Sequence, residues 1–407
     1  MRLFDFINRL SKGRSNFRMS GDPLISVVIP CYNYGEYLEE TIDSVLNSTF
    51  QDVEIIVVDD GSDDPGTVHL LSSLDKPKTT VIKQSNKGVA AARNKGFTEA
   101  KGKYILPLDA DDLIHPTYLE KAFWIMELFP RVGFVSPQVK AFGTENWVHD
   151  APQYNFHKLL FHNIACGTSL LRKEAFVQAG GYKSGFVVMG YEDWDFWITV
   201  GEKGWYGYSI FERLFLYRRH GRSMVHEAID HHEQLVGQIK ARHPLLYQED
   251  YLNQLKQRWE NNSPLKDMSP RIQNGSDWQN YTSKQTTPNK PRWLLLMPQT
   301  NRERLSPRCL NFVDGLHSDF YVVTMVGTEY VTGSDIDEFS WLTSDIFNLP
   351  LYVPKIELKL DIMERLISKL IATRGIDRIF LLGSRQGHYL RPYIQNGFPH
   401  IPIEIIE

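Results

Sequence analysis

The chain is poor in cysteine, has no long apolar run and carries no surplus of basic residues. Its three cysteines, Cys31, Cys166 and Cys309, are odd in number and far apart, which argues against a disulfide framework and against a CxxC zinc site. No apolar stretch reaches the roughly 18–20 residues of a membrane-spanning helix, and the N-terminus lacks the apolar core of a signal peptide. The net charge of −4 argues against a nucleic-acid-binding protein. These absences predict a cytoplasmic protein.

Two apolar segments near the N-terminus have the pattern of buried parallel strands. Leu24 to Pro30 precedes a short polar loop and a helical stripe of apolar residues, and Val53 to Val58 ends on Asp59 and Asp60. Successive strand–loop–helix units indicate a parallel sheet in an α/β fold. Ligands of such sheets bind at the carboxyl ends of the strands, which is where Pro30, Asp59 and Asp60 fall.

A third apolar run, Tyr104 to Leu108, ends in a cluster of acidic residues. Asp109 and Asp111 are one residue apart, and alternate residues of an extended segment face the same way, so both carboxylates can bind one cation. Mg²⁺ and Mn²⁺ prefer such oxygen ligands, and the ion in turn can hold a diphosphate. This role requires acids that solvent can reach and that no lysine or arginine pairs. An isolated DxDD sequence, with Asp112 beside the pair, is also typical of a solvated turn.

Five motifs in order resemble the family-2 glycosyltransferases of GT-A fold, and the resemblance covers roughly residues 23–225. The motifs are Ser26 to Asn33, Val57 to Asp63, Asn86 to Gly88 with Ala92 to Gly96, the acidic box at 109–112, and Gly190 to Asp195. The resemblance implies an α/β fold with a mixed, mainly parallel sheet. It also implies inverting transfer of a sugar from a nucleotide-diphosphate sugar, with a UDP-sugar as the expected donor, to a hydroxyl acceptor in cell-surface glycan assembly.

The resemblance also suggests which residues bind the donor. Asp60 is expected at the nucleobase or ribose, with Asp59 and the Pro30 backbone nearby. The alternative for these acids is a cap on the next helix, a role that suits Asp63. Arg93 matches a basic residue near the donor, where a guanidinium suits phosphate oxygens, although a surface arginine on a helix would look the same in the sequence.

Metal ligands are expected where the diphosphate leaves. Negative charge grows on the leaving oxygen in the transition state, and a cation neutralises it. Asp109, Asp111 and His220 are therefore the expected ligands of Mn²⁺ or Mg²⁺, and Asp109 is also expected to contact the donor. For His220 a structural role is the alternative, because a lone histidine is often structural.

The acceptor hydroxyl has to lose a proton, and Asp193 matches the catalytic aspartate of the family. Glu192 and Asp112 are expected to position the acceptor or a backbone amide. Two adjacent acids near a helix start also suit the helix dipole without any catalytic role. The chain lacks the QxxRW box of processive synthases, for which Arg218 to His220 is no substitute, so we expect addition of a single sugar.

The chain divides into four parts on its sequence pattern. Residues 1–22 hold five basic and two acidic residues among apolar ones, a pattern that suits peripheral contact with an anionic membrane and a lipid-linked glycan acceptor. A helix packed on the catalytic domain, or a frayed tail, fits the same segment. Residues 23–258 form the transferase domain, and 259–290 read as a polar linker. Residues 291–407 resemble one lobe of a GT-B glycosyltransferase, and a docking or scaffold module is the alternative. In this part we expect strands at 292–297, 320–326, 378–382 and 401–406 and a helix at 358–373.

Three other functions compete with this one. A nucleotidyltransferase of similar α/β fold also uses paired acids and a metal, but Pro30 to Asn33 lacks the glycine-rich loop expected after its first strand. A glycoside hydrolase needs two carboxylates beside the bond and no nucleotide. A non-catalytic sugar-binding or scaffold protein would bind without turnover.

Overall fold

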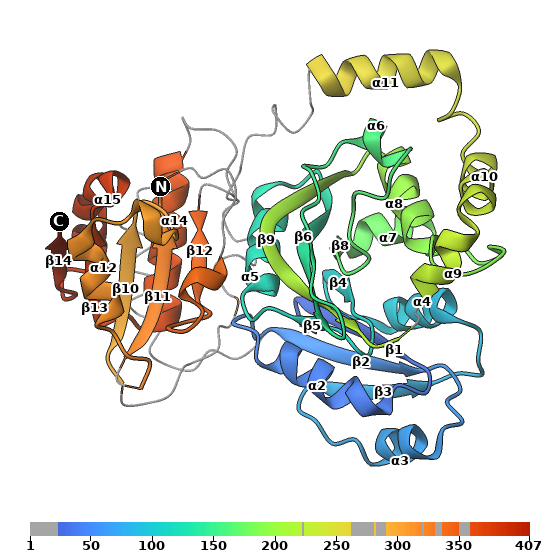
Figure 1. Cartoon of the computed structure of the whole chain (residues 1–407), viewed down its shortest axis with the longest axis horizontal. Coiled ribbons are helices and arrows are strands. Elements are labelled where there is room, and N and C mark those ends of the chain that lie inside the picture. Colours follow the sequence, from blue (N-terminus) through green and yellow to red (C-terminus); the bar gives the residue numbers. More distant parts are fainter. Residues whose placement is uncertain are drawn as a thin grey trace. The chain divides into compact units, whose positions relative to one another are not determined.

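The computed structural model describes residues 23–221, 224–261, 281, 290–319, 321–329, 336–349 and 359–407. The chain forms two compact units (Figure 1), the first of which contains Pro23–Ser48 and Asp52–Tyr281, while the second is built around Thr282–Glu407. Residues 1–22, predicted as a basic amphipathic segment, lie outside the described residues. Of the predicted linker at 259–290, only residues 259–261, 281 and 290 are described.

The first unit contains a nine-stranded mixed sheet. Strands β3, β2, β1 and β4 are mutually parallel neighbours in that order, and β8 continues the sheet in the antiparallel direction. The long strands β6 and β9 pair in parallel, and β5 forms the edge. The expected α/β fold with a mixed sheet is therefore confirmed. The strands are β1 Ile25–Cys31, β2 Val53–Asp59, β3 Thr79–Lys83, β4 Tyr104–Pro107, β5 Leu113–Ile114, β6 Val132–Gly143, β7 Val148–His149, β8 Leu170–Arg172 and β9 Tyr206–Arg219.

Helices of this unit follow the expected apolar stripes. In α2 the buried side chains include Leu38, Ile42 and Val45, which recur at helical spacing. Gly96 of α4 lies so close to Val28 of β1 that a Cβ atom there would collide with it, so this glycine allows the helix to pack tightly on the sheet. The helices are α2 Gly35–Leu46, α3 Pro65–Ser73, α4 Val89–Glu99, α5 Tyr118–Leu128, α6 Phe156–Leu159, α7 Lys173–Ala179, α8 Glu192–Glu202, α9 Met224–Asp230, α10 His232–Arg242 and α11 Glu249–Asn261.

A buried tyrosine extends the first unit beyond its predicted end at residue 258. The hydroxyl of Tyr281 donates to Glu120 Oε1 at 2.5 Å and accepts from Trp124 Nε1 at 3.1 Å, and its ring meets Phe123 edge-on. All three partners lie on α5. The predicted polar linker therefore contains a residue that packs into the first unit, which the polar composition of the linker did not indicate.

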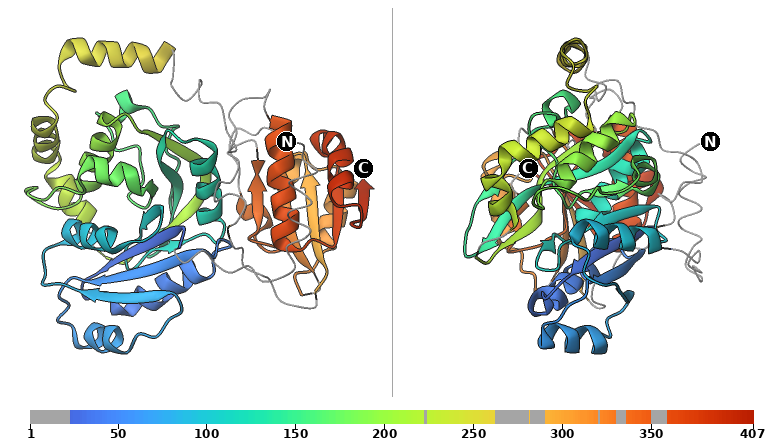
Figure 2. Two further views of the ribbon diagram at one scale, coloured as in Figure 1. Left: turned by 180° about the vertical axis from the view of Figure 1, so that it is seen from behind. Right: turned by 90° about the vertical axis from the view of Figure 1, so that its right-hand side faces the viewer.

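The second unit is a five-stranded parallel sheet in the order β12-β11-β10-β13-β14. Figures 1 and 2 show α12 on one face of this sheet and α14 on the other. The strand order reverses between β10 and β13, as in doubly wound α/β folds. The four predicted strands and the predicted helix are confirmed. The elements are β10 Arg292–Met297, η2 Arg302–Arg304, α12 Pro307–Asp314, β11 Val322–Gly327, η3 Ile336–Phe339, β12 Ile346–Asn348, α14 Lys359–Arg374, β13 Arg378–Leu382, α15 Arg385–Gly397 and β14 Ile403–Ile406.

No helix in the described ranges is both long enough and apolar enough to cross a bilayer. The three cysteines of the chain all lie in these ranges and are free thiols, in agreement with the expected lack of a disulfide framework.

Candidate active site

Three parallel strands of the first sheet end at one edge and carry the predicted donor residues there. Strand β1 ends at Cys31, directly after Pro30, and the register pairs Cys31 with Asp59 at the end of β2. Strand β4, on the other side of β1, ends two residues before Asp109. The fold therefore gathers at one edge three segments that are far apart in the sequence, where ligands of such sheets bind.

Asp60 is buried and holds the loop that precedes α4. Its Oδ1 atom accepts hydrogen bonds from Gln84 Nε2 at 2.7 Å and from the Lys87 backbone N–H at 2.9 Å, while its Oδ2 atom accepts from the Gly88 N–H at 2.8 Å. The Asn-Lys-Gly motif is therefore tied to the end of β2 by one carboxylate. Nucleobase contact by Asp60 stays a prediction, because the bonds described here run within the protein.

Asn33 joins the loop after β1 to the loop after β2. Its side-chain Oδ1 accepts from the backbone N–H groups of Asp63 and Asp64, each at 3.0 Å, and its Nδ2 donates to Asp63 Oδ1 at 2.6 Å. The predicted helix cap at Asp63 is wrong by one residue, since it is Asp64 that caps α3 by accepting from the Thr67 N–H. Asp63 instead pairs with Asn33, whose backbone has the positive φ of 60° that asparagine tolerates.

The acidic box is paired rather than free. Asp109 forms an ion pair with Arg93 at 2.8 Å, Asp111 Oδ2 lies 2.7 Å from His220 Nε2, and buried Asp112 accepts from the Arg218 backbone N–H at 2.7 Å. The expectation that no arginine pairs these acids is therefore wrong for Asp109. Three carboxylates within four residues repel one another, and basic neighbours and hydrogen bonds offset part of that repulsion.

Arg93 connects the acidic box to the predicted catalytic pair. It is buried in α4, with one terminal nitrogen 2.8 Å from Asp109 Oδ1 and the other 2.8 Å from Glu192 Oε1. Both ends of the guanidinium are thus bound to carboxylates, which differs from the expected role of a phosphate ligand. The buried carboxylate of Glu192 requires a nearby positive charge, and Arg93 supplies it while also pairing with the partly exposed Asp109.

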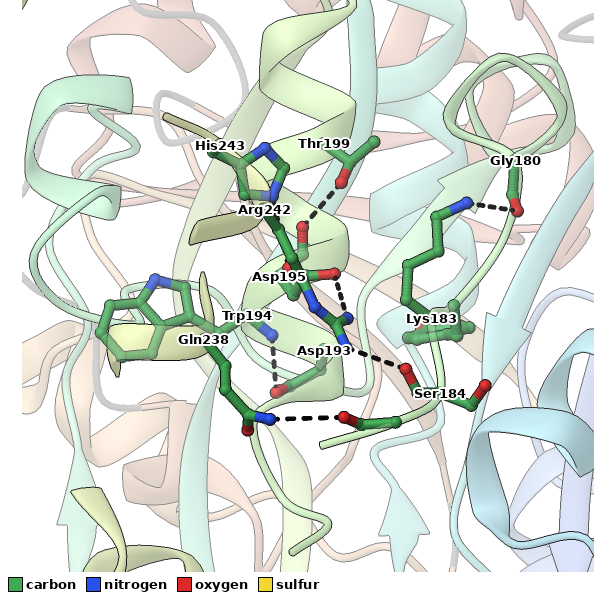
Figure 3. Close-up of polar contacts among 12 residues, drawn as sticks. Gly180, Lys183, Ser184, Asp193, Trp194, Asp195, Thr199, Gln238, Arg242 and His243 are labelled. Atoms are coloured by element: carbon green, nitrogen blue, oxygen red, sulfur yellow. Dashed lines mark hydrogen bonds and ion pairs between the residues drawn. The ribbon is translucent and has the colours of Figure 1, made fainter. Parts of the chain in front are cut away.

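Glu192 and Asp193 form the first turn of α8. Glu192 Oε2 accepts from the Gly190 backbone N–H at 2.7 Å. The Oδ1 atom of Asp193 accepts from the Trp194 N–H at 2.7 Å, as Figure 3 shows, and its Oδ2 atom accepts from Asn163 Nδ2 at 3.2 Å. Desolvation in the site, followed by the charge of Glu192, raises the pKa of Asp193 to about 7. A partly exposed carboxylate with this pKa can accept a proton near neutral pH.

The expected metal ligands are grouped by the fold, although their geometry is not that of a closed site. In the described part of the chain no three His, Cys, Asp or Glu side chains form a ready metal-ligand cluster. Asp111 nevertheless contacts His220 directly, and burial followed by the charge of Asp109 raises the pKa of Asp111. Carboxylate oxygens such as those of Asp109 and Asp111 suit Mn²⁺ or Mg²⁺. The residues therefore fit a divalent cation.

The loop that leads into α8 is fastened by side chains of α10 (Figure 3). Arg242 donates to the Ser184 carbonyl at 2.8 Å and lies 3.3 Å from Asp195 of α8, and Gln238 donates to the Gly185 carbonyl at 3.3 Å. His243 lies 3.3 Å from the same Asp195 carboxylate. These bonds fix the loop that leads to Glu192 and Asp193.

Five of these contact residues were not recognised as site residues from the sequence: Asn33, Gln84, Asn163, Gln238 and Arg242. Each is a common polar residue whose partner lies at least 24 positions away in the chain. Only Asn33 carried a signal, since it ends the first motif.

Residues 26–185 match the family described as Glycosyl transferase family 2. A putative teichuronic acid biosynthesis glycosyltransferase, TuaG of Bacillus subtilis, is 32% identical over 204 residues, which are 48% of this chain and 79% of TuaG. An uncharacterized glycosyltransferase of Haemophilus influenzae is 28% identical over 232 residues, 53% of this chain and 71% of the relative. The S. aureus TarS 1-349 structure in complex with UDP-GlcNAc is 17% identical, covers 63% of this chain and 78% of that one, and has a TM-score of 0.46.

The chain belongs to glycosyl transferase family 2. It is therefore an enzyme, a glycosyltransferase, and the family resemblance drawn from the five motifs is confirmed.

Loss of the Arg93 side chain should strongly destabilise the first unit. Arg93→Met leaves Glu192 buried without its cation, and breaking a buried ion pair in this way costs about 3–5 kcal/mol. The urea midpoint of unfolding measures this, and Arg93→Met combined with Glu192→Gln should recover part of the loss. Lys95→Met removes an exposed pair on the same helix and should leave the midpoint almost unchanged. Equal midpoints for both single variants would contradict the bridging role.

Proposed function

We propose that this chain transfers a single sugar from a nucleotide-diphosphate sugar, with a UDP-sugar as the expected donor, to a hydroxyl group of a glycan or lipid-linked glycan. The transfer inverts the anomeric centre and uses Mn²⁺ or Mg²⁺. The observation that carries the proposal is the Arg93 bridge, which links Asp109 on the donor side to Glu192 beside the catalytic aspartate. Donor and acceptor chemistry thus share one charge network.

Asp193 is the general base in this proposal. The acceptor O–H gives its proton to the Asp193 carboxylate, and the acceptor oxygen forms a bond to the anomeric carbon as the bond from that carbon to the diphosphate oxygen breaks. The electron pair of the broken bond leaves with the nucleoside diphosphate. A single displacement by one nucleophile inverts the centre.

Other residues of the site position and neutralise charge. Asp109, Asp111 and His220 would hold the cation, which supplies charge neutralisation for the leaving diphosphate when bound. Asp59, Asp60 and the Pro30 backbone are assigned to the nucleoside, because they lie at the ends of the neighbouring strands β1 and β2. Glu192 and Asp112 are assigned to positioning, since each accepts a backbone N–H at the site.

The place of the enzyme in the cell is also a proposal. The name of TuaG refers to teichuronic acid biosynthesis, and this relative supports the proposed role in cell-surface glycan assembly. We propose that the chain acts in the cytoplasm, with peripheral membrane contact through residues 1–22. For residues 291–407 we propose a GT-B-like lobe or a docking module, supported by the doubly wound order of its parallel strands.

Activity should follow the ionisation of Asp193. Because a general base works only in its deprotonated form, kcat should fall as the pH drops through about 7 and level off above it. A pH–rate profile between pH 5.5 and 9 at saturating donor and metal measures this. A rate that is constant down to about pH 5.5 would contradict the assignment of Asp193.

Nucleotide binding tests the donor class separately from turnover. We expect nucleoside diphosphates to raise the Tm of the protein in the presence of Mn²⁺ and to do so much less in EDTA, because Asp109, Asp111 and His220 would hold a cation that would offset the negative charge of the diphosphate. Comparing uridine, guanosine, adenosine and cytidine diphosphates identifies the base. If none of them shifts the Tm with metal present, the proposed donor class is wrong.

A further inference from the structure

The loop between α6 and β8 reaches the predicted catalytic base. It is held at its start by two hydrogen bonds, from Trp194 Nε1 to the Leu159 carbonyl at 2.6 Å and from the Tyr247 hydroxyl to the Leu160 carbonyl at 2.9 Å. Further along, the Cys166 N–H donates to a serine hydroxyl of β6 at 2.8 Å. The backbone of this loop is therefore fixed on both sides of Asn163.

Asn163 meets the carboxylate of Asp193 from the solvent side. Its side chain is exposed, its Nδ2 donates to Asp193 Oδ2 at 3.2 Å, and its Oδ1 accepts from the Ala165 N–H at 3.4 Å. The bond to Ala165 sets the orientation of the amide, so that its N–H₂ group faces the base.

Both carboxylate oxygens of Asp193 are then oriented. Oδ1 is bound by the Trp194 N–H of its own helix and Oδ2 by Asn163 of the loop. Gly167 lies beside Oδ2, where a Cβ atom would stand 3.3 Å from that oxygen. The plane of the carboxylate is thus set by two donors from different elements, and one of them is a side chain that can be changed without altering α8.

We propose that Asn163 is a positioning residue, which orients the Asp193 carboxylate and stabilises its ionised form by donating to Oδ2. This inference rests on the proposed role of Asp193 as the base. A hydrogen bond to the charged form of an acid favours that form, so Asn163 keeps the base ready to accept a proton near neutral pH.

The charges around Asp193 either raise or lower its pKa, and the hydrogen bond from Asn163 acts against those that raise it. Glu192 on the same helix raises the pKa of Asp193, while Arg93 of α4 and the two hydrogen bonds lower it. The neutral groups near it are Tyr182, Tyr191 and Cys166. Arg93 pairs with Asp109 and Glu192, so among the described residues Asn163 is the side chain that donates a hydrogen bond to Asp193.

The test compares pH–rate profiles of the full chain and two variants. Asn163→Ala removes the hydrogen-bond donor to Asp193, and Asn163→Asp replaces it with a second carboxylate of the same shape. The acidic limb of the profile, where the rate falls as the pH drops, should therefore move to higher pH in the first variant and further in the second. A shift of one pH unit lowers the rate tenfold on the acidic side. We expect about 3- to 10-fold loss at pH 6 for Asn163→Ala, with donor KM unchanged and a smaller loss above pH 8.

A matched control separates this role from a general loss of structure. Asn253→Ala makes the same change on the exposed face of α11 and should leave the profile unchanged. A fall in the plateau rate with no shift of the limb, or profiles identical to that of the unchanged chain, would overturn the proposal. If the unchanged chain itself has no acidic limb, then the base assignment fails first, and the positioning role fails with it.

Discussion

Replacing Asp193 with asparagine should lower the rate of transfer by about 10²–10⁴-fold, which is the usual contribution of a general base. Asparagine keeps the shape of the side chain and can still contact Asn163 and the Trp194 N–H, but it cannot accept the acceptor proton. Donor affinity should stay nearly unchanged, because no residue assigned to the nucleoside or the diphosphate is altered. Steady-state transfer and calorimetric binding of the donor measure the two effects.

The control for this variant is Asp250→Asn, an exposed acid of α11, which should transfer sugar normally. The opposite result for Asp193→Asn would contradict its assignment as the base. If donor affinity collapses while transfer is normal at saturating donor, Asp193 belongs to the nucleotide site and the base lies elsewhere.

The second large effect is expected at Asp111. Asp111→Asn removes one negative ligand without changing the shape of the site, so Mn²⁺ affinity should fall and turnover should drop by about 10²–10³-fold, as the loss of several kcal/mol of charge stabilisation implies. Calorimetry with Mn²⁺ alone follows binding without reference to activity. Asp75→Asn, an exposed acid in the loop after α3, is the control. Full turnover by Asp111→Asn in EDTA would exclude the metal site.

The buried parallel strands were predictable because their signals are local. Apolar runs such as Val53 to Val58 end on polar residues, and this pattern marks a buried parallel strand whether or not its neighbours are known. Three elements of the second unit, β12, α12 and α15, were not predicted. Strand β12 has only three residues, and α15 has Pro392 in its interior, which weakens any helical prediction.

The residue types of the site could be predicted from the sequence, but the side chains that pair with one another there could be predicted less well. The acids at 109–112 and at 192–193 lie at the end of a strand and the start of a helix, and both positions can be inferred from short segments. The partners of Arg93 cannot, because Glu192 lies 99 positions away and either a phosphate or a carboxylate would satisfy a guanidinium. Asn163 has no motif of its own, and only the folded loop brings it to Asp193.

Release of nucleoside diphosphate from a panel of nucleotide sugars tests the central claim most directly. The full chain is incubated with each donor, with Mn²⁺ or with EDTA, alongside Asp193→Asn and Asp111→Asn. The account predicts that at least one donor, a UDP-sugar first, is turned over with metal, and that EDTA and both substitutions suppress the reaction. Equal release of nucleoside diphosphate by the unchanged chain and by Asp193→Asn, with metal and in EDTA alike, would contradict it.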